Sequence, residues 1–257
     1  MPSTSHPDAR TDPRRLDVTD LQRIERFRRA GYGGNVSDAL WKCGVTDTVL
    51  SADFRPLRQG MVLVGRALPV KVHSLADQDL TPEETMAQEA RWEAAGGHPQ
   101  KQMMRTVASR ENGTVLCFDT GGDRQPAHFG EMSCQLAYAH GCRGMLLAGN
   151  CRDTQYVLQM PDFPVYSFGT RPNAFGGWII TDVDKPIYLW GHLTHYVRVT
   201  PGDFIFADND GVQLIPEAYV DEVLLQVEET YEVENAERAE IAAGMSVDEV
   251  YRKFGVL

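Results

Sequence analysis

The 257-residue chain lacks several features that define common classes of protein. It holds no uncharged apolar run near 18 residues, so the sequence predicts no membrane span, and it holds no G-x-G-x-x-G or P-loop spacing for nucleotide phosphates. Its five cysteines include no C-x-x-C pair, which favours free thiols over a disulfide framework or a structural zinc site. The first 15 residues lack an apolar run, so we expect no secretory signal and predict a cytoplasmic protein.

Positive charge is also scarce. The chain carries 25 Lys and Arg against 36 Asp and Glu, a net charge of −11. Because neutralising phosphates requires a basic face, this balance argues against nucleic acid as a partner, and we expect no membrane partner. Most of the negative charge lies in residues 216–257, where a solvated helix face is the ordinary explanation. The hydrophobic content of 42% is typical of a globular protein.

Periodicity and capping signals predict an α/β protein. We interpret residues 1–15 as a flexible segment and residues 16–257 as one domain with an insertion at about 78–110. Apolar residues at helical spacing predict helices at both ends of the chain, and Val-rich segments predict strands between them. The expected helices cover 16–30, a short stretch capped by Asn35, 131–140, 153–159, 217–242 and 247–254; the expected strands cover 61–72, 114–118, 144–147, 163–168, 187–190, 195–199, 204–207 and 212–215. This order predicts a layered α-β-β-α sandwich around a central β-sheet core.

The insertion has helix signals of its own. Thr81-Pro82-Glu83-Glu84 is a capping box with proline at the first helical position. Gly96-Gly97-His98-Pro99 should end that helix, and a second short helix is expected over 100–109. We expect this segment to lie at the edge of the domain.

The candidate chemistry lies in residues 130–153. Gly130 and Glu131 open a predicted helix, whose first amides, those of Met132 and Ser133, lack partners within the helix and are suited to bind a carboxylate or phosphate. Arg152 and Asp153 follow the next strand, and ligands of α/β sheets gather at the carboxyl ends of strands. An arginine fork suits a carboxylate, and an aspartate suits a hard cation such as Mg²⁺. A surface ion pair is the alternative.

Four blocks of sequence resemble one family, the class II 4-hydroxy-4-methyl-2-oxoglutarate aldolases, which also includes regulators of ribonuclease E activity. The blocks are Asn35-Val-Ser-Asp-Ala-Leu40; Gly130-Glu131 with the helix after it; Arg152-Asp153 with Phe163-Pro-Val165, Gly169 and Pro172; and Pro201-Gly-Asp203 with Ala207-Asp-Asn-Asp-Gly211-Val212 and Pro216. The resemblance covers about residues 20–235 and leaves the insertion outside. The chain departs from the family pattern at Ala148-Gly149, where Asp-Gly is common, and at Glu131, where Asp is common.

The resemblance implies a role for each matching residue. Asp153 matches the ligand of a divalent metal, Mg²⁺ or Mn²⁺, and Arg152 matches the residue that holds the keto acid and steadies its enolate. Gly130, Glu131, Met132 and Ser133 match the loop whose amides hold the pyruvyl carboxylate. Glu131 also matches an acid that contacts water on the metal. The resemblance further implies a homotrimer or homohexamer, with one acid of each site supplied by a neighbour's C-terminal region; Glu217, Glu222 and Glu228 are equal candidates.

The activity that follows is a metal-dependent lyase. Such an enzyme would cleave a 4-hydroxy-2-keto acid or diacid by a retro-aldol reaction that releases pyruvate, and the same enolate-stabilising site would decarboxylate oxaloacetate. A Schiff-base route is disfavoured because all five lysines lie outside the matching blocks. The alternative is a non-catalytic regulator that binds a ribonuclease or another protein.

Overall fold

The computed structural model describes residues 15–75, 80–174, 177–192 and 195–255, so the expected flexible segment lies almost entirely outside the described residues. Within these ranges one sheet of nine strands follows the order β1-β6-β5-β3-β2-β10-β11, with β4 paired to β5 and β7 paired to β2. The strands are β1 (Arg55–Pro56), β2 (Leu63–Ser74), β3 (Thr114–Asp119), β4 (Ala127–Phe129), β5 (Cys142–Cys151), β6 (Val165–Thr170), β7 (Trp178–Val183), β10 (Phe204–Asp208) and β11 (Gly211–Ile215). A separate two-stranded ribbon joins β8 (Ile187–Trp190) to β9 (Tyr196–Val199).

The pairing is mixed, and its parallel part positions the candidate site. β3 runs parallel to β2 and to β5, and β5 also runs parallel to β4 and to β6. The carboxyl ends of these strands therefore meet at one edge of the sheet, where ligands of α/β proteins bind. β10, β11, β7 and β1 pair antiparallel with their neighbours.

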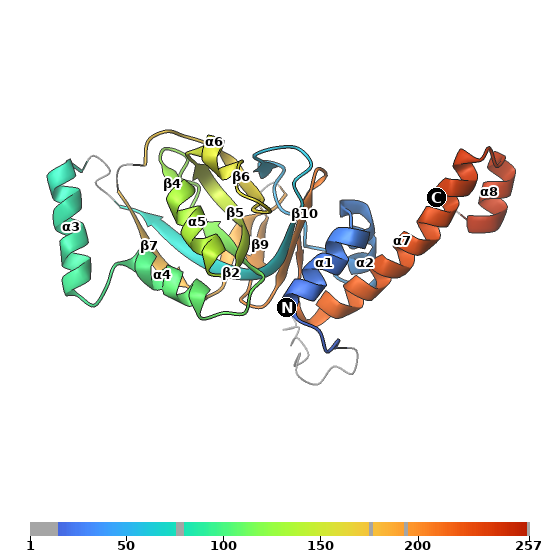
Figure 1. Ribbon diagram of the computed structural model, residues 1–257, viewed down its shortest axis with the longest axis horizontal. Helices are drawn as coiled ribbons and strands as arrows, with labels where there is room; N and C mark the ends of the chain where they lie inside the picture. The colour runs from blue at the N-terminus through green and yellow to red at the C-terminus, as the bar shows by residue number, and fades with distance from the viewer. Residues whose placement is uncertain (1–14, 76–79, 175–176, 193–194, 256–257) are drawn as a thin grey trace.

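One short segment brings the two ends of the sheet together. Val49 forms an isolated antiparallel bridge with Gln213 of β11. A few residues later, Arg55 and Pro56 form β1, which pairs with β6 at the opposite end of the strand order. Because this segment bonds to β11 through Val49 and then forms β1 at the other end of the strand order, the sheet curls into a nearly closed, barrel-like shape (Figure 1).

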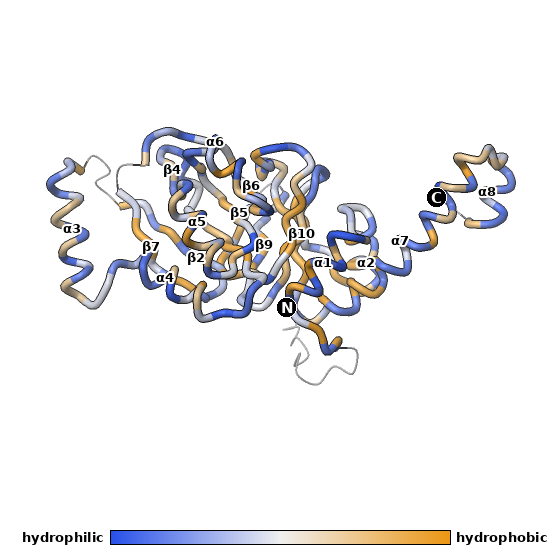
Figure 2. Tube along the Cα trace, in the orientation of Figure 1, coloured by the Kyte–Doolittle hydropathy of each residue, from blue (hydrophilic) through white to orange (hydrophobic). Residues whose placement is uncertain are grey.

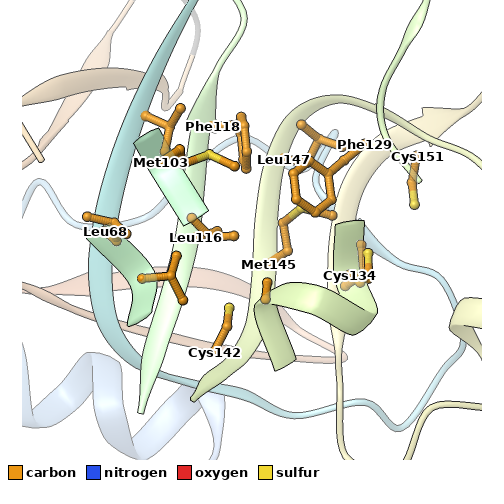
Figure 3. Close-up of a cluster of buried hydrophobic side chains, with 14 of the residues drawn as sticks. Leu68, Met103, Leu116, Phe118, Phe129, Cys134, Cys142, Met145, Leu147 and Cys151 are labelled. Carbon is orange, nitrogen blue, oxygen red and sulfur yellow. The ribbon is translucent and has the colours of Figure 1, made fainter. Parts of the chain in front are cut away.

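Side chains of the strands alternate between the inside and the outside of this curled sheet. In β3, Val115 and Cys117 join an inner cluster with the β8–β9 ribbon, whereas Leu116 and Phe118 join an outer cluster beneath helices. Figure 3 shows the outer cluster, in which Phe118 lies beside Met103 of α4, and Cys134 of α5 lies beside Phe129 and Met145. Both faces of the central strands are thus apolar, which explains why the sequences of these strands are continuous hydrophobic runs.

The helices pack on the outer face in two groups (Figure 1). α4 (Pro99–Ala108) and α5 (Glu131–Ala139) cover β3 and β5, whereas α1 (Asp20–Ala30), α2 (Gly33–Lys42) and α7 (Val220–Ala242) cover β10 and β11. The remaining helices are α3 (Pro82–Ala94), α6 (Thr154–Val157), the 3-10 turn Glu217–Tyr219 and α8 (Val247–Phe254). The α/β class, the sheet core and the helices at both ends are confirmed. The layers, however, arise from one curled sheet and not from two stacked sheets.

The start of a helix was predicted correctly where the sequence contains a capping box. α3 begins at Pro82, with Thr81 and Glu84 in a reciprocal capping box, as expected. Asn35 is not the N-cap of α2: Tyr32 is, and Asn35 lies one turn inside the helix, where its Oδ1 accepts the Tyr32 N–H at 2.9 Å. Strand β7 was not expected; it extends the sheet by pairing with the far end of β2.

The end of the chain stands apart from the body. The buried residues of α7 all lie in its first half, up to Val227. Beyond that point α7 projects away and α8 folds back on it, with apolar and polar residues interspersed along this part (Figures 1 and 2). None of the helices in the described ranges combines the length and apolarity that crossing a membrane requires.

A buried ion network ties α1 to the sheet and to α7. Asp20 is 5% exposed, and its carboxylate accepts hydrogen bonds from the Arg66 guanidinium on β2, one of them at 2.8 Å. Arg23, also 5% exposed, lies 3.4 Å from Asp20 and donates to Asp221 of α7 at 2.7 Å. Buried charges are tolerated only when they are paired in this way.

We therefore predict that Asp20→Asn destabilises the fold, because it leaves Arg66 and Arg23 with less compensating negative charge. The free energy of unfolding from urea titration should fall by about 3 kcal/mol. The matched control is Asp53→Asn, which removes an exposed partner of Arg124 and should cost less than about 1 kcal/mol. Equal effects of the two substitutions would contradict the role given to the buried network.

Candidate active site

The candidate site forms where β4 and β5 end. The two strands run parallel, and the first residue after β5, Arg152, donates its backbone N–H to the Phe129 carbonyl at the end of β4, at 3.0 Å. This bond brings Gly130, which follows β4, against the two residues that follow β5. Segments more than twenty residues apart in the sequence thus meet at the open edge of the sheet.

Gly130 makes this close approach possible. It is the N-cap of α5 and has an extended backbone that any residue adopts, so its conformation does not explain the glycine. A Cβ atom there would lie 2.7 Å from the Asp153 Oδ2 and 3.1 Å from the Arg152 Nε. The space a side chain would fill is therefore occupied by the two charged groups, and only glycine fits without displacing them.

The carboxylate of Asp153 faces the amino-terminal end of α5. The Glu131 N–H points to Asp153 Oδ2 at 3.4 Å, and Arg152 Nε lies 3.4 Å from the same oxygen. Asp153 has φ 56° and ψ 31°, a left-handed conformation that aspartate tolerates better than most residues. The Arg152 and Asp153 side chains remain 38% and 44% exposed, so both charged groups are accessible to a ligand.

The structure brings most of the expected site residues together. Gly130, Glu131, Arg152 and Asp153 share one edge of the sheet through the contacts above. Met132 is 75% exposed on the first turn of α5. Ser133 lies on the same turn, but its Oγ accepts a hydrogen bond from Gln100 of α4 at 2.8 Å, which links the candidate site to the insertion.

Arg171 is a further candidate that the sequence analysis missed. It lines an open depression beside Arg152 and Asp153, together with Thr154, Gln155, Thr170 and Pro172. Its backbone N–H donates to the Cys151 carbonyl at 3.0 Å, which holds it next to the end of β5. Its position directly after β6 is the signal that could have identified it, because polar residues after parallel strands converge at one edge.

The donor set fits a hydrated hard cation better than a cage of protein ligands. In the ranges that the structure describes, no group of three or more His, Cys, Asp or Glu residues is placed to hold a metal. One accessible carboxylate, that of Asp153, faces the depression. Mg²⁺ keeps several waters and is commonly bound through one or two carboxylates plus substrate oxygens, so Asp153 fits Mg²⁺ or Mn²⁺.

The layer beneath the site is buried and largely apolar. Contact with Cys151 and burial raise the pKa of the Cys134 thiol, and the same contact lowers the pKa of Cys151. Both cysteines are fully buried in the outer cluster (Figure 3), so Cys151 is a packing residue. Burial lowers the pKa of His128 on β4, whose ring lies 5.7 Å from that of Trp178, and this keeps the imidazole neutral near pH 7.

The three candidate C-terminal acids are not at this site within one chain. Glu228 accepts from Arg26 at 2.6 Å and lies 3.2 Å from Arg29, and the hydrogen bond with Arg26 is the main cause of its lowered pKa. Glu217 lies 3.5 Å from Arg66. Glu222 belongs to α7, which packs with α1 and α2 on the outer face over β10 and β11, away from the strands that α5 covers (Figure 1). An acid from this region would have to come from another subunit.

Comparison with known proteins identifies the family. Residues 34–214 match the model of the RraA-like family, described as Aldolase/RraA. These residues make up more than half of the chain, so the chain belongs to the RraA-like family, and the resemblance seen in the sequence is confirmed.

The individual relatives are distant. A protein of Thermus thermophilus named 4-hydroxy-4-methyl-2-oxoglutarate aldolase is 32% identical over 116 residues, which is 45% of this chain and 67% of the relative. A relative from Hahella chejuensis is 33% identical over 106 residues, 41% of this chain and 61% of its own length. The matches therefore span about three fifths to two thirds of these relatives.

A solved structure shares the fold over most of the chain. RraAS2 of Streptomyces coelicolor, described as an unusual member of the RNase ES inhibitor RraA protein family, superimposes with a TM-score of 0.68 and 19% identity. The match covers 87% of this chain and all of that protein. At this identity the likeness concerns the fold alone.

We predict that Gly130→Ala displaces Arg152 and Asp153 without unfolding the protein, because the added Cβ meets side-chain atoms that are partly exposed. The NMR resonances of the Glu131 amide and the Arg152 Nε–H should shift, while the free energy of unfolding changes by less than about 2 kcal/mol. Gln135→Ala, on the exposed face of the same helix, is the control. Unshifted resonances in Gly130→Ala would show that the glycine contact does not position the pair.

Proposed function

We propose that the protein is a divalent-metal-dependent lyase that cleaves a 4-hydroxy-2-keto acid by a retro-aldol reaction and releases pyruvate, with oxaloacetate decarboxylation as a companion activity. The observation that supports this proposal best is the contact of Arg152 and Asp153 with Gly130 at the start of α5. It places a cation, a carboxylate and helix-terminal N–H groups around one accessible point. Such a set suits a substrate with adjacent carboxylate and keto groups.

Different residues of this chain would bind the carboxylate of the substrate, its keto oxygen and the metal ion. The first amides of α5 beyond Glu131, those of Met132 and Ser133, lack partners within the helix and can hold the carboxylate of the keto acid. Among the described residues, the Arg152 guanidinium makes one ion pair, with Asp153. Its other N–H groups can donate to the keto oxygen and stabilise the charge that develops there. A divalent cation held by Asp153 would, when bound, act as a Lewis acid that withdraws electron density from the keto oxygen.

The bond changes then follow from the substrate. The 4-hydroxyl proton passes to a base, for which Glu131 at the helix start is our candidate, directly or through one water. The electron pair of that O–H bond forms the new carbonyl at C4, the C3–C4 bond breaks, and its electrons move into the pyruvate enolate that Arg152 stabilises. Return of the proton to C3 gives pyruvate. In oxaloacetate the bond that breaks is the one to the leaving carboxylate, and the same enolate forms.

The decisive experiment is a screen of 4-hydroxy-2-keto acids and oxaloacetate with Mg²⁺ or Mn²⁺, with pyruvate as the product measured. Pyruvate that forms only when the metal is present would support the lyase. Tight capture of a ribonuclease, with no metal-dependent turnover of any substrate, would instead favour the non-catalytic regulator. Retention of Arg152, Asp153 and the glycine contact is why we favour the lyase.

We predict that Asp153→Asn lowers kcat/KM by a factor on the order of 100 or more, because polarisation by a metal ion is worth several kcal/mol in such reactions. Asp162→Asn is a matched control, since Asp162 also has a left-handed backbone (φ 54°) and an exposed ion pair. The control should retain full activity. Activity of Asp153→Asn within twofold of wild type at saturating Mg²⁺ would refute the metal assignment.

We further propose that the protein assembles as a homotrimer or homohexamer with sites shared between subunits. The C-terminal arm, which we define as residues 229–255, supports this proposal. It projects from the body (Figure 1) and exposes apolar side chains, of which Val233 is 53%, Ile241 44%, Val247 71% and Tyr251 50% exposed. A second copy of the chain is the occupant that would cover these residues and bring an acid to the Asp153 site.

Light scattering should accordingly give three or six times the chain mass of 28.7 kDa. The double variant Ile241→Asp, Val247→Asp should shift the protein toward monomer and reduce turnover, because burying a charge in an apolar contact is costly. Met86→Glu, at an equally exposed apolar position on α3, should leave the mass unchanged. A fully active wild-type monomer at micromolar concentration would exclude the shared site.

A further inference from the structure

The insertion builds a pocket of its own. This insertion pocket lies between α3 and α4 on one side and β7 on the other, and its walls include Trp92, His98 and Gln100 from the helices and Trp178 and Ile180 from the strand. Trp92 and His98 meet edge to face, with ring centroids 5.0 Å apart. Aromatic walls of this kind are typical of sites that bind flat apolar groups.

Two contacts join the insertion pocket to the candidate active site. Gln100, in the pocket wall, donates to Ser133 Oγ at 2.8 Å, and Ser133 lies three residues after Gly130, about 4.5 Å along the helix axis. Trp178, in the opposite wall, packs against His128, two residues before Gly130. The insertion pocket and the Arg152–Asp153 pair therefore flank the same helix start.

The charge of the insertion pocket limits what it accepts. Its wall, as far as the structure describes it, holds one charged side chain, Glu89, and neither lysine nor arginine. A second carboxylate on the substrate would find no cation there and would face Glu89, at a cost in desolvation and repulsion. Gln88 and Gln100 offer neutral hydrogen-bonding groups. The chemistry thus favours an uncharged, largely apolar group.

We infer that the insertion pocket holds the far end of the substrate, and that this substrate is a 4-hydroxy-2-keto acid whose C4 carries an aromatic or other uncharged apolar group. The inference rests on the proposed lyase function and narrows the substrates of the retro-aldol reaction to monoacids. Cleavage of the C3–C4 bond converts R–CHOH–CH₂–CO–COO⁻ into the aldehyde R–CHO and pyruvate, with the hydroxyl proton transferred to C3 and no other reactant. The aldehyde R–CHO is then the fragment that leaves from the insertion pocket.

The test compares 4-hydroxy-2-oxo-4-phenylbutanoate with 4-hydroxy-4-methyl-2-oxoglutarate, a diacid, and with oxaloacetate, which has no far end. The wild type should prefer the phenyl compound over the diacid in kcat/KM by about tenfold or more. Trp178→Ala should lower the ratio of kcat/KM for the phenyl compound to that for oxaloacetate by about tenfold. Trp41→Ala, an exposed tryptophan on α2, is the matched control and should change neither.

A second variant guards against misfolding of the first. Glu89 is exposed on α3, so Glu89→Lys should fold normally. It adds a cation to the pocket wall and should raise kcat/KM for the diacid relative to the phenyl compound. A wild-type preference for the diacid, or a ratio that neither Trp178→Ala nor Glu89→Lys changes, would overturn the pocket assignment while leaving the lyase intact.

Binding measured without turnover separates the two proposals. 4-Fluorobenzyl alcohol, an uncharged aryl probe, should bind the wild type in ¹⁹F NMR and bind Trp178→Ala at least about tenfold more weakly. If no substrate yields pyruvate but the probe binds in this way, the lyase proposal fails and the aromatic pocket stands. If pyruvate forms but the probe does not bind, the lyase stands and the pocket assignment fails.

Discussion

The burial of β5 on both faces is the constraint on which the rest of the structure depends. Met145 and Leu147 face the outer cluster, whereas Leu146 and Ala148 face the inner one. A strand of this kind must lie in the middle of a sheet, with neighbours on both edges and covering layers on both faces. β5 accordingly bonds to β3, β4 and β6. The carboxyl end of β5 pairs with β4 on one side and β6 on the other. These pairings fix the position of the backbone that continues into Arg152 and Asp153.

Closure of the sheet follows from the same constraint. The inner side chains of β3, β5, β10 and β11 form one cluster with the β8–β9 ribbon, and a flat sheet could not bring strands from both ends of the order to one ribbon. The curl also places the helices outside, in two groups on opposite sides. As a result α7 and its acids lie far from the candidate site of their own chain (Figure 1). This geometry is why a shared site requires a second copy.

The segment of α3 and α4, which the sequence predicts to be an insertion, packs on the core through one of its two helices. α3 buries none of its residues, whereas α4 contributes Met103, Met104 and Val107 to the outer cluster. α4 therefore anchors the segment to the core, and α3 forms one wall of the insertion pocket. Gln100, at the start of α4, reaches Ser133 at the start of α5. A segment of this kind can change which substrate is accepted without changing the reaction, because the reacting end and the far end of the substrate contact different elements.

Most of the helices and strands, and four residues of the candidate site, could be predicted from the sequence alone. A capping box predicts the start of α3, four blocks of sequence indicate the family, and Gly130, Glu131, Arg152 and Asp153 lie in those blocks. Local signals suffice for such features because they act within a few residues. Three features could be seen only in the tertiary structure: residues 49–56 link β11 to β1 at the other end of the sheet, Arg171 lies beside Asp153, and Trp92 faces β7. These depend on contacts between residues far apart in the chain, which no local pattern encodes.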